Sequence, residues 1–201
     1  YYLPENSELF LYTPDYKYII GAFTSQNNSD DGVFATTVLP GNCVIIEYFE
    51  PYYVTDRVNF TVTKVVSGYK NIFFPEMKGY GSSGFCNINV NCPDGYDWQN
   101  EKRSVVLIML KNNSRICSGT LINNTKQNAR PFVLTANHCL GAENTWIFLF
   151  NCESSDCNNA NGPLQYTIQG SVLRAADISS DFALVEMKSK PPLSYNAYYS
   201  G

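Results

Sequence analysis

Phe182-Ala183-Leu184-Val185-Glu186-Met187 is the last of six short runs, rich in apolar side chains, that follow one another between residues 104 and 187. The other five cover residues 104–110, 116–122, 131–136, 145–150 and 166–173. Loops rich in Asn, Gly, Ser and Asp separate the runs, and these residue types favour turns. Six short strands with regular turn signals predict an all-β fold in which this part of the chain forms a barrel.

A second group of β-type runs precedes the first group. It covers residues 9–12, 18–20, 43–48 and 58–62, with polar or Gly/Pro breaks between the runs. Because no segment shows a convincing helical period, we expect a small β-sandwich-like module over residues 1–77.

The boundary between the two groups is the glycine- and serine-rich stretch Met77-Lys78-Gly79-Tyr80-Gly81-Ser82-Ser83-Gly84. It divides the chain into domains 1–77 and 78–201. Lys78 followed by the small Gly79 is also a candidate processing site. An ordinary flexible linker explains the same composition equally well.

Composition excludes several classes of protein. The 201 residues are 44% hydrophobic, which is enough for a sizeable core. A net charge of −4 argues against a nucleic-acid partner, which usually requires a basic face. No run of about 18 apolar residues occurs, so we expect no membrane-spanning helix.

Seven cysteines are present, with the spacings Cys86-x5-Cys92 and Cys152-x4-Cys157. These spacings do not match a zinc knuckle, and a single histidine argues against a Cys/His zinc site. Disulfides in an oxidising, extracellular compartment explain the cysteines better. The odd count leaves at least one thiol without a partner in the chain.

The only histidine, His138, lies in Leu134-Thr135-Ala136-Asn137-His138-Cys139. A lone histidine is more often structural than catalytic, but here an apolar strand precedes it and a cysteine follows it. A bridge from Cys139 to Cys117, which is near the start of the run 116–122, would hold the loop that bears the imidazole. Closing a loop of about twenty residues contributes roughly 3 kcal/mol in the chain-entropy model.

Asp181 immediately precedes the mostly apolar run 182–187. The common use of aspartate at such a position is to make a turn. Alternatively, a buried Asp181 carboxylate accepts the Nδ1–H of His138 and stabilises the imidazolium that forms during catalysis. With Asp177 close by in the sequence, the residues alone leave both interpretations open.

Four segments carry a family pattern: residues 83–92, 117–121, 134–139 and 180–186. They contain the pieces C-N-I-x-V-x-C, C-S-G-T-L and T-A-x-H-C. Together the segments resemble bacterial lysyl endopeptidases, which are secreted serine proteases of the chymotrypsin-like superfamily. The second and third pieces are typical of the superfamily, and the first piece in the same order is specific for this branch. The resemblance extends from about residue 79 to the end.

The resemblance implies a double β-barrel with the active site in the cleft between the barrels. Residues 78–201 would form the first, six-stranded barrel, and the second barrel is expected C-terminal to this chain. His138 would be the general base and Asp181 the residue that orients it. The implied disulfides are Cys117–Cys139 and Cys92–Cys157; Cys86 would bridge to the second barrel, and Cys43 and Cys152 have no assigned partner.

One element of the family is absent from the sequence. The nucleophilic serine of the family lies in a Gly-x-Ser-Gly-type loop after the aspartate, and no such loop follows Asp181. The similar run at residues 81–84 precedes the histidine and is interpreted as linker. The full-length protein is thus expected to be a secreted serine endopeptidase that cleaves proteins or peptides after Lys or another basic residue, without metal or cofactor. The fragment alone is expected to be inactive.

Two further interpretations stay open. The chain could be a non-catalytic binding or adhesion module that retains the protease fold. Residues 3–5, 21–24 and 44–51 loosely resemble segments that precede the protease domain in related enzymes, which would make residues 1–77 a propeptide of a zymogen or an accessory structure. Their aromatic content fits an interface, but it fits a plain hydrophobic core equally well.

Overall fold

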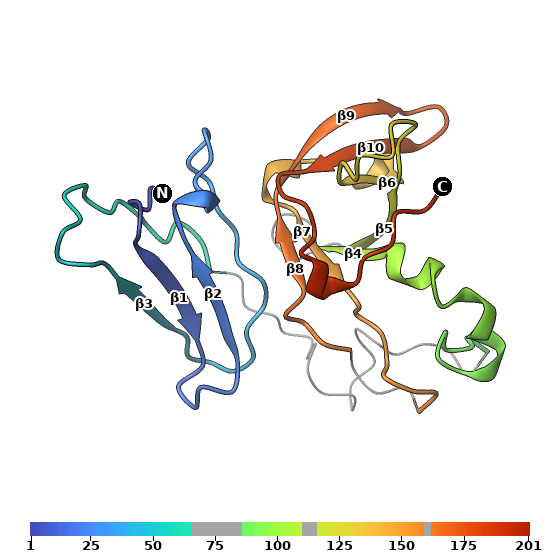
Figure 1. Cartoon of the computed structure of the whole chain (residues 1–201), viewed down its shortest axis with the longest axis horizontal. Helices are drawn as coiled ribbons and strands as arrows, with labels where there is room; N and C mark the ends of the chain where they lie inside the picture. Colours follow the sequence, from blue (N-terminus) through green and yellow to red (C-terminus); the bar gives the residue numbers. More distant parts are fainter. Residues whose placement is uncertain (66–85, 110–115, 159–161) are drawn as a thin grey trace. The chain divides into compact units, whose positions relative to one another are not determined.

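The computed structural model describes residues 1–65, 86–109, 116–158 and 162–201. The chain forms two compact units, Tyr1–Val65 and Val66–Gly201 (Figure 1). The described elements are β-strands and short 3-10 turns, which confirms the predicted all-β class. The predicted boundary at residues 77 and 78, and with it Lys78 and Gly79, lies outside the described residues. Among the described residues, no helix has the length and apolarity needed to cross a membrane.

The first unit contains one three-stranded antiparallel sheet. Its strands are β1 (Glu8–Tyr12), β2 (Ile19–Phe23) and β3 (Ile45–Phe49), in the order β2-β1-β3. Leu3, Leu9 and Phe23 form the buried centre. The predicted run 58–62 forms no strand and makes only an isolated bridge, between Asn59 and Tyr2.

The second unit contains a seven-stranded antiparallel sheet in the order β8-β7-β4-β5-β6-β10-β9. Each of the six predicted runs appears in it. The strands are β4 (Val105–Met109), β5 (Ile116–Ile122), β6 (Phe132–Ala136), β7 (Ile147–Phe150), β8 (Thr167–Gln169), β9 (Ser171–Asp177) and β10 (Phe182–Met187).

This sheet curls into a barrel-like form because its two edge strands are consecutive in the chain. Only Gly170 separates β8 from β9 (Figure 1). The Gly170 N–H donates to the Trp146 carbonyl before β7 (2.7 Å), and the Gly170 carbonyl accepts the Lys188 N–H after β10 (3.0 Å). The two edges therefore meet at one residue. Gly170 has φ +71°, so the single predicted run 166–173 is divided into two strands at this point.

Strand alternation fills the interior of the curled sheet. Val106 and Ile108 of β4, Val133 of β6, and Val185 and Met187 of β10 point inward, as a period of two requires. On β5, Gly119 is buried at a point where a Cβ atom would lie 2.6 Å from the Val133 side chain, so only glycine fits there. The remaining members of the core are Leu121, Cys139, Trp146, Phe148, Phe150 and Ile168.

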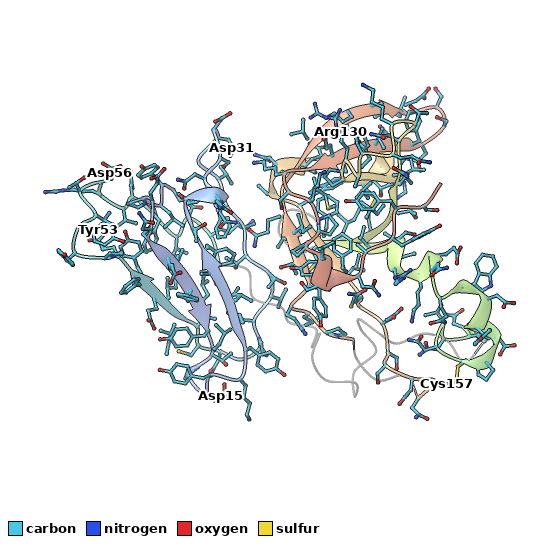
Figure 2. The ribbon with its side chains drawn as sticks, in the orientation of Figure 1. Asp15, Asp31, Tyr53, Asp56, Arg130 and Cys157 are labelled. Atoms are coloured by element: carbon cyan, nitrogen blue, oxygen red, sulfur yellow. A yellow bond between two sulfur atoms is a disulfide. The ribbon has the colours of Figure 1, made fainter. Side chains whose placement is uncertain are left out.

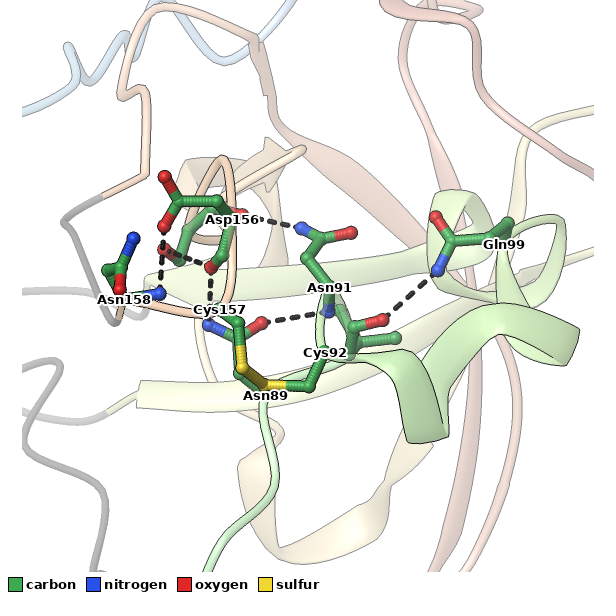
Figure 3. Close-up of a disulfide and its surroundings, with 9 residues drawn as sticks. Asn89, Asn91, Cys92, Gln99, Asp156, Cys157 and Asn158 are labelled. Carbon is green, nitrogen blue, oxygen red and sulfur yellow. Dashed lines mark hydrogen bonds between the residues drawn. A yellow bond between two sulfur atoms is a disulfide. The ribbon is translucent and has the colours of Figure 1, made fainter.

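A disulfide between Cys92 and Cys157 joins the segment before β4 to the loop between β7 and β8 (Figure 3). Asparagine side chains support the bridge. The Asn91 amide donates to the Ser154 carbonyl (2.5 Å), and the Asn89 amide donates to the Asp156 carbonyl (3.1 Å). Asn89 and Asn91 of the C-N-I-N-V-N-C run thus bond the same loop that the disulfide holds.

Candidate active site

His138 lies in a single 3-10 turn, Asn137–Cys139 (η5), at the end of β6. Two anchors hold this turn. Cys139 is buried and forms a disulfide with Cys117 on the neighbouring strand β5. Near the end of β6, three residues before the histidine, the Thr135 hydroxyl donates to the Ser118 carbonyl of β5 (2.8 Å). The hydrogen bond to β5 and the disulfide therefore fix the backbone that presents the imidazole.

Asp181 lies in the loop between β9 and β10, immediately before Phe182. Phe182 pairs with Ala136 across the β6–β10 ladder, so the start of β10 lies opposite the end of β6. The Asn137 N–H donates to the Asp181 carbonyl (3.0 Å) and extends this pairing by one bond. Antiparallel pairing thus brings two residues that are 43 positions apart to the same end of the barrel.

The two residues make a two-point contact through the Asp181 carboxylate. The His138 Nδ1 and Asp181 Oδ2 atoms are 2.7 Å apart, and the His138 backbone N–H donates to Asp181 Oδ1 (2.9 Å). Both carboxylate oxygens are therefore bonded to the same residue. The bond to the imidazole, and after it the bond to the backbone N–H, hold the pKa of Asp181 below its ordinary value.

Because an ionised carboxylate only accepts hydrogen bonds, Nδ1 of His138 carries the hydrogen and Nε2 is left as the basic nitrogen. The sequence interpretation expected a buried carboxylate, but the Asp181 side chain is 50% exposed and that of His138 is 61% exposed. The contact is thus made by backbone placement and hydrogen bonding rather than by burial.

The structure separates the roles of the two nearby aspartates. Asp177, the last residue of β9, accepts the N–H groups of Ser179 (2.6 Å) and Ser180 (3.2 Å) through Oδ1. Asp177 therefore makes the turn, whereas Asp181 contacts the histidine. The residues alone left this assignment open, whereas the family resemblance implied Asp181.

Two residues that sequence reasoning did not single out support the site. The first is Thr135, whose hydroxyl bonds β5 just before the histidine. The buried Trp146 donates its indole N–H to the Gly141 carbonyl (3.1 Å), which ties the loop after the histidine to the barrel core. The position of Thr135 in the T-A-x-H-C motif was a usable signal for the first; the tryptophan lies outside any motif.

Within the described residues, one group of three metal-type ligands comes together: Cys117, His138 and Cys139. Two of its members are the sulfurs of a disulfide and are not thiolates, so the group is not a metal-binding set in this oxidation state. Cys43, Cys86 and Cys152 form no disulfide in the structure. Burial raises the pKa of the Cys152 thiol, which makes it a poor nucleophile.

Comparison with known proteins matches residues 80–201 to the family described as lysyl endopeptidase, C-terminal domain. A curated lysyl endopeptidase of Pseudomonas aeruginosa is 26% identical over 139 residues, which cover 61% of this chain and 29% of that protein. The chain thus spans less than a third of the length of this relative. The family match includes every residue of the histidine–aspartate site and covers more than half of the chain, so the chain belongs to the lysyl endopeptidase family.

Proposed function

We propose that the complete protein is a secreted serine endopeptidase that hydrolyses peptide bonds after lysine or another basic residue. The supporting observation is the two-point contact between Asp181 and His138, which leaves Nε2 as the basic nitrogen. The nucleophilic serine, the oxyanion hole and the specificity pocket belong to a second barrel, C-terminal to these residues. The proposed preference for lysine rests on the descriptions of the matched family and of the relative as lysyl endopeptidases.

In this mechanism the serine hydroxyl attacks the scissile carbonyl while Nε2 of His138 removes its proton. His138 then returns this proton to the leaving amine, and Asp181 stabilises the imidazolium through Nδ1. Asp181 stays ionised throughout, in accord with its lowered pKa. The chemistry uses no metal or organic cofactor. The disulfide Cys117–Cys139 holds the base in place during both proton transfers.

The half-exposed state of the pair fits this proposal. A charge-stabilising hydrogen bond is stronger when water is excluded. Packing of the second barrel against this end of the first would cover His138 and Asp181. The two disulfides agree with an extracellular location, because such bonds persist in oxidising compartments.

The test uses the complete, folded protein and a fluorophosphonate probe, which labels an activated serine. We expect labelling of the wild type and its loss in His138→Ala. Asp181→Asn should lower kcat by on the order of 10⁴-fold, because the neutral side chain favours the wrong tautomer of the histidine. Asp156→Asn is the matched control. Asp156 accepts a backbone N–H in a different loop (2.8 Å), and its change should leave kcat unaltered.

Specificity is tested by cleavage of peptide amides that differ only in the residue before the scissile bond, with Lys, Arg and Gln compared. Faster cleavage after Lys supports the proposal. A folded, full-length sample that neither labels nor cleaves would contradict it and would favour a non-catalytic binding or adhesion module with the same fold.

A further inference from the structure

The loop that carries Asp181 is short and is organised from within. It consists of residues 178–181, between Asp177 and Phe182, which pair across the β9–β10 ladder. Asp177 Oδ1 accepts two successive backbone N–H groups, from Ser179 (2.6 Å) and Ser180 (3.2 Å). These are the two residues immediately before Asp181, so one carboxylate oxygen determines the path of the chain into the catalytic aspartate.

Asp181 needs such support because its backbone conformation is unfavourable. Its φ is +53°, in the left-handed region that side chains with a Cβ atom rarely adopt. In this conformation its carbonyl faces the Asn137 N–H and its carboxylate faces His138. If the residue relaxed to an ordinary negative φ, the side chain would leave in another direction and both contacts with His138 would break.

Packing does not hold the Asp181 side chain, since half of it is exposed. Ile178, at the other end of the loop, is 83% exposed and contributes no buried anchor either. On the C-terminal side the loop is held by pairing of Phe182 with Ala136. On the N-terminal side Asp177 pairs with Phe182, and within the loop the hydrogen bonds to the Asp177 carboxylate are the restraint that the structure shows.

We infer that Asp177 is a positioning residue for the His138–Asp181 pair: its carboxylate fixes the left-handed backbone of Asp181 and thereby the tautomer of His138. Asp177 acts through Asp181 and makes no contact with the reacting atoms. The effect on catalysis rests on the proposed function, whereas the effect on the histidine does not.

The structural arm of the test uses the 201-residue chain, in which His138 is the sole histidine and its ring signals need no assignment. The ring ¹⁵N chemical shifts at a pH where the imidazole is neutral report the tautomer. We expect the Nδ1–H form to dominate in the wild type and a mixture in Asp177→Ala. Asp177→Asn keeps an oxygen acceptor at the same place and should retain the wild-type ratio.

Asp177→Ser, whose hydroxyl accepts hydrogen bonds more weakly, should give a His138 tautomer ratio between those of the Ala and Asn variants. If Asp177→Ala does not fold, Asp177→Ser provides the test in its place. Asp156→Ala is the matched control because Asp156 bonds the Asn158 N–H in the same way in a different loop (2.8 Å). It should leave the His138 tautomer unchanged.

The kinetic arm uses the complete protein. A displacement of about 1 Å in a catalytic group can cost on the order of 10²-fold, so we expect Asp177→Ala to lower kcat by about 10- to 100-fold with KM unchanged, and Asp177→Asn to restore kcat. A wild-type tautomer ratio in Asp177→Ala would overturn the inference, as would an Asn variant that behaves like Ala. If the complete wild type lacks protease activity, the proposed function fails, and the tautomer measurement still decides the role of Asp177.

Discussion

At the scale of single residues, the site depends on hydrogen bonds that replace burial. Asp181 is half exposed, yet both of its carboxylate oxygens are bonded to His138. The sequence identified the two residues by motif and resemblance. Without the resemblance, the residues alone did not assign the turn to Asp177 and the histidine contact to Asp181, because that choice depends on which carboxylate faces the end of β6 once the strands pair.

The lowered pKa of Asp181 gives the first prediction. Removing the imidazole in His138→Ala removes the largest cause of the shift, so the pKa of Asp181 should rise toward its ordinary value of 3.8. Carboxyl ¹³C shifts followed against pH measure this. Because the pKa is depressed in the fold, the contact stabilises the protein above the ordinary pKa and this contribution disappears as pH falls through the folded value. An unchanged Asp181 titration in the variant would show that the pair does not form.

At the scale of elements, one carboxylate joins strands β9 and β10 and the segment that leads into β6. Glu186 of β10 accepts two bonds from Arg130, which precedes β6 (2.9 and 2.5 Å), and one from Arg174 of β9 (2.7 Å). Figure 2 labels Arg130 on the barrel. Its guanidinium also lies over the Phe132 ring, 4.8 Å from the centroid. Charge pairing thus supplements the backbone ladder at the end of the strands remote from His138.

The bonds between Glu186 and the two arginines predict that the second unit becomes less stable at low pH. Arg130, and with it Arg174, lowers the pKa of Glu186 below its ordinary value of 4.5. The network therefore contributes its full stability above pH 4.5 and loses it as pH falls through the folded pKa. Glu186→Gln should cost about 1 kcal/mol at neutral pH, since both arginines are nearly half exposed, and less at pH 3, which is below the ordinary pKa of 4.5. Urea unfolding at both pH values measures this, with Glu101→Gln as control; an equal loss at both values would contradict it.

Barrel closure gives a prediction on a glycine. A Cβ atom at Gly170 would lie 2.8 Å from the Asn144 carbonyl, and the residue has φ +71°. Gly170→Ala should therefore destabilise the second unit by roughly 1–3 kcal/mol. Gly141→Ala is the control, because Gly141 also has a positive φ (+139°) but has no atom within 4 Å of its added Cβ. Thermal unfolding compares them; equal losses would show that the contact at Gly170 has no effect of its own.

At the scale of the whole molecule, two units with separate cores make up the chain. The boundary that composition predicts at residues 77 and 78 lies outside the described residues and stays a prediction. The family match begins at residue 80, close to the composition boundary. We propose that residues 1–77 are an accessory or propeptide module.

Cleavage between Lys78 and Gly79 is the corresponding prediction. The mature secreted protein should begin at Gly79, and Lys78→Gln should keep the N-terminal module attached, as measured by intact mass and N-terminal sequencing. Lys70→Gln, which changes a lysine before residues 77–84, is the control. Unchanged processing in Lys78→Gln would leave residues 77–84 as a plain linker.

The sequence by itself determined the all-β class and the positions of the six runs that form the barrel strands, and its motifs together with the family resemblance pointed to His138 and Asp181, because period-two patterning, turn residues and short motifs are local properties. The tertiary structure alone decided what depends on contacts between distant residues. These are the closure of the sheet at Gly170, the failure of residues 58–62 to form a strand, the exposure of Asp181 and the hydrogen bonds by which Asp177 makes the turn. The physical reason is that strand pairing sets which carboxylate reaches His138, and no local pattern encodes that register.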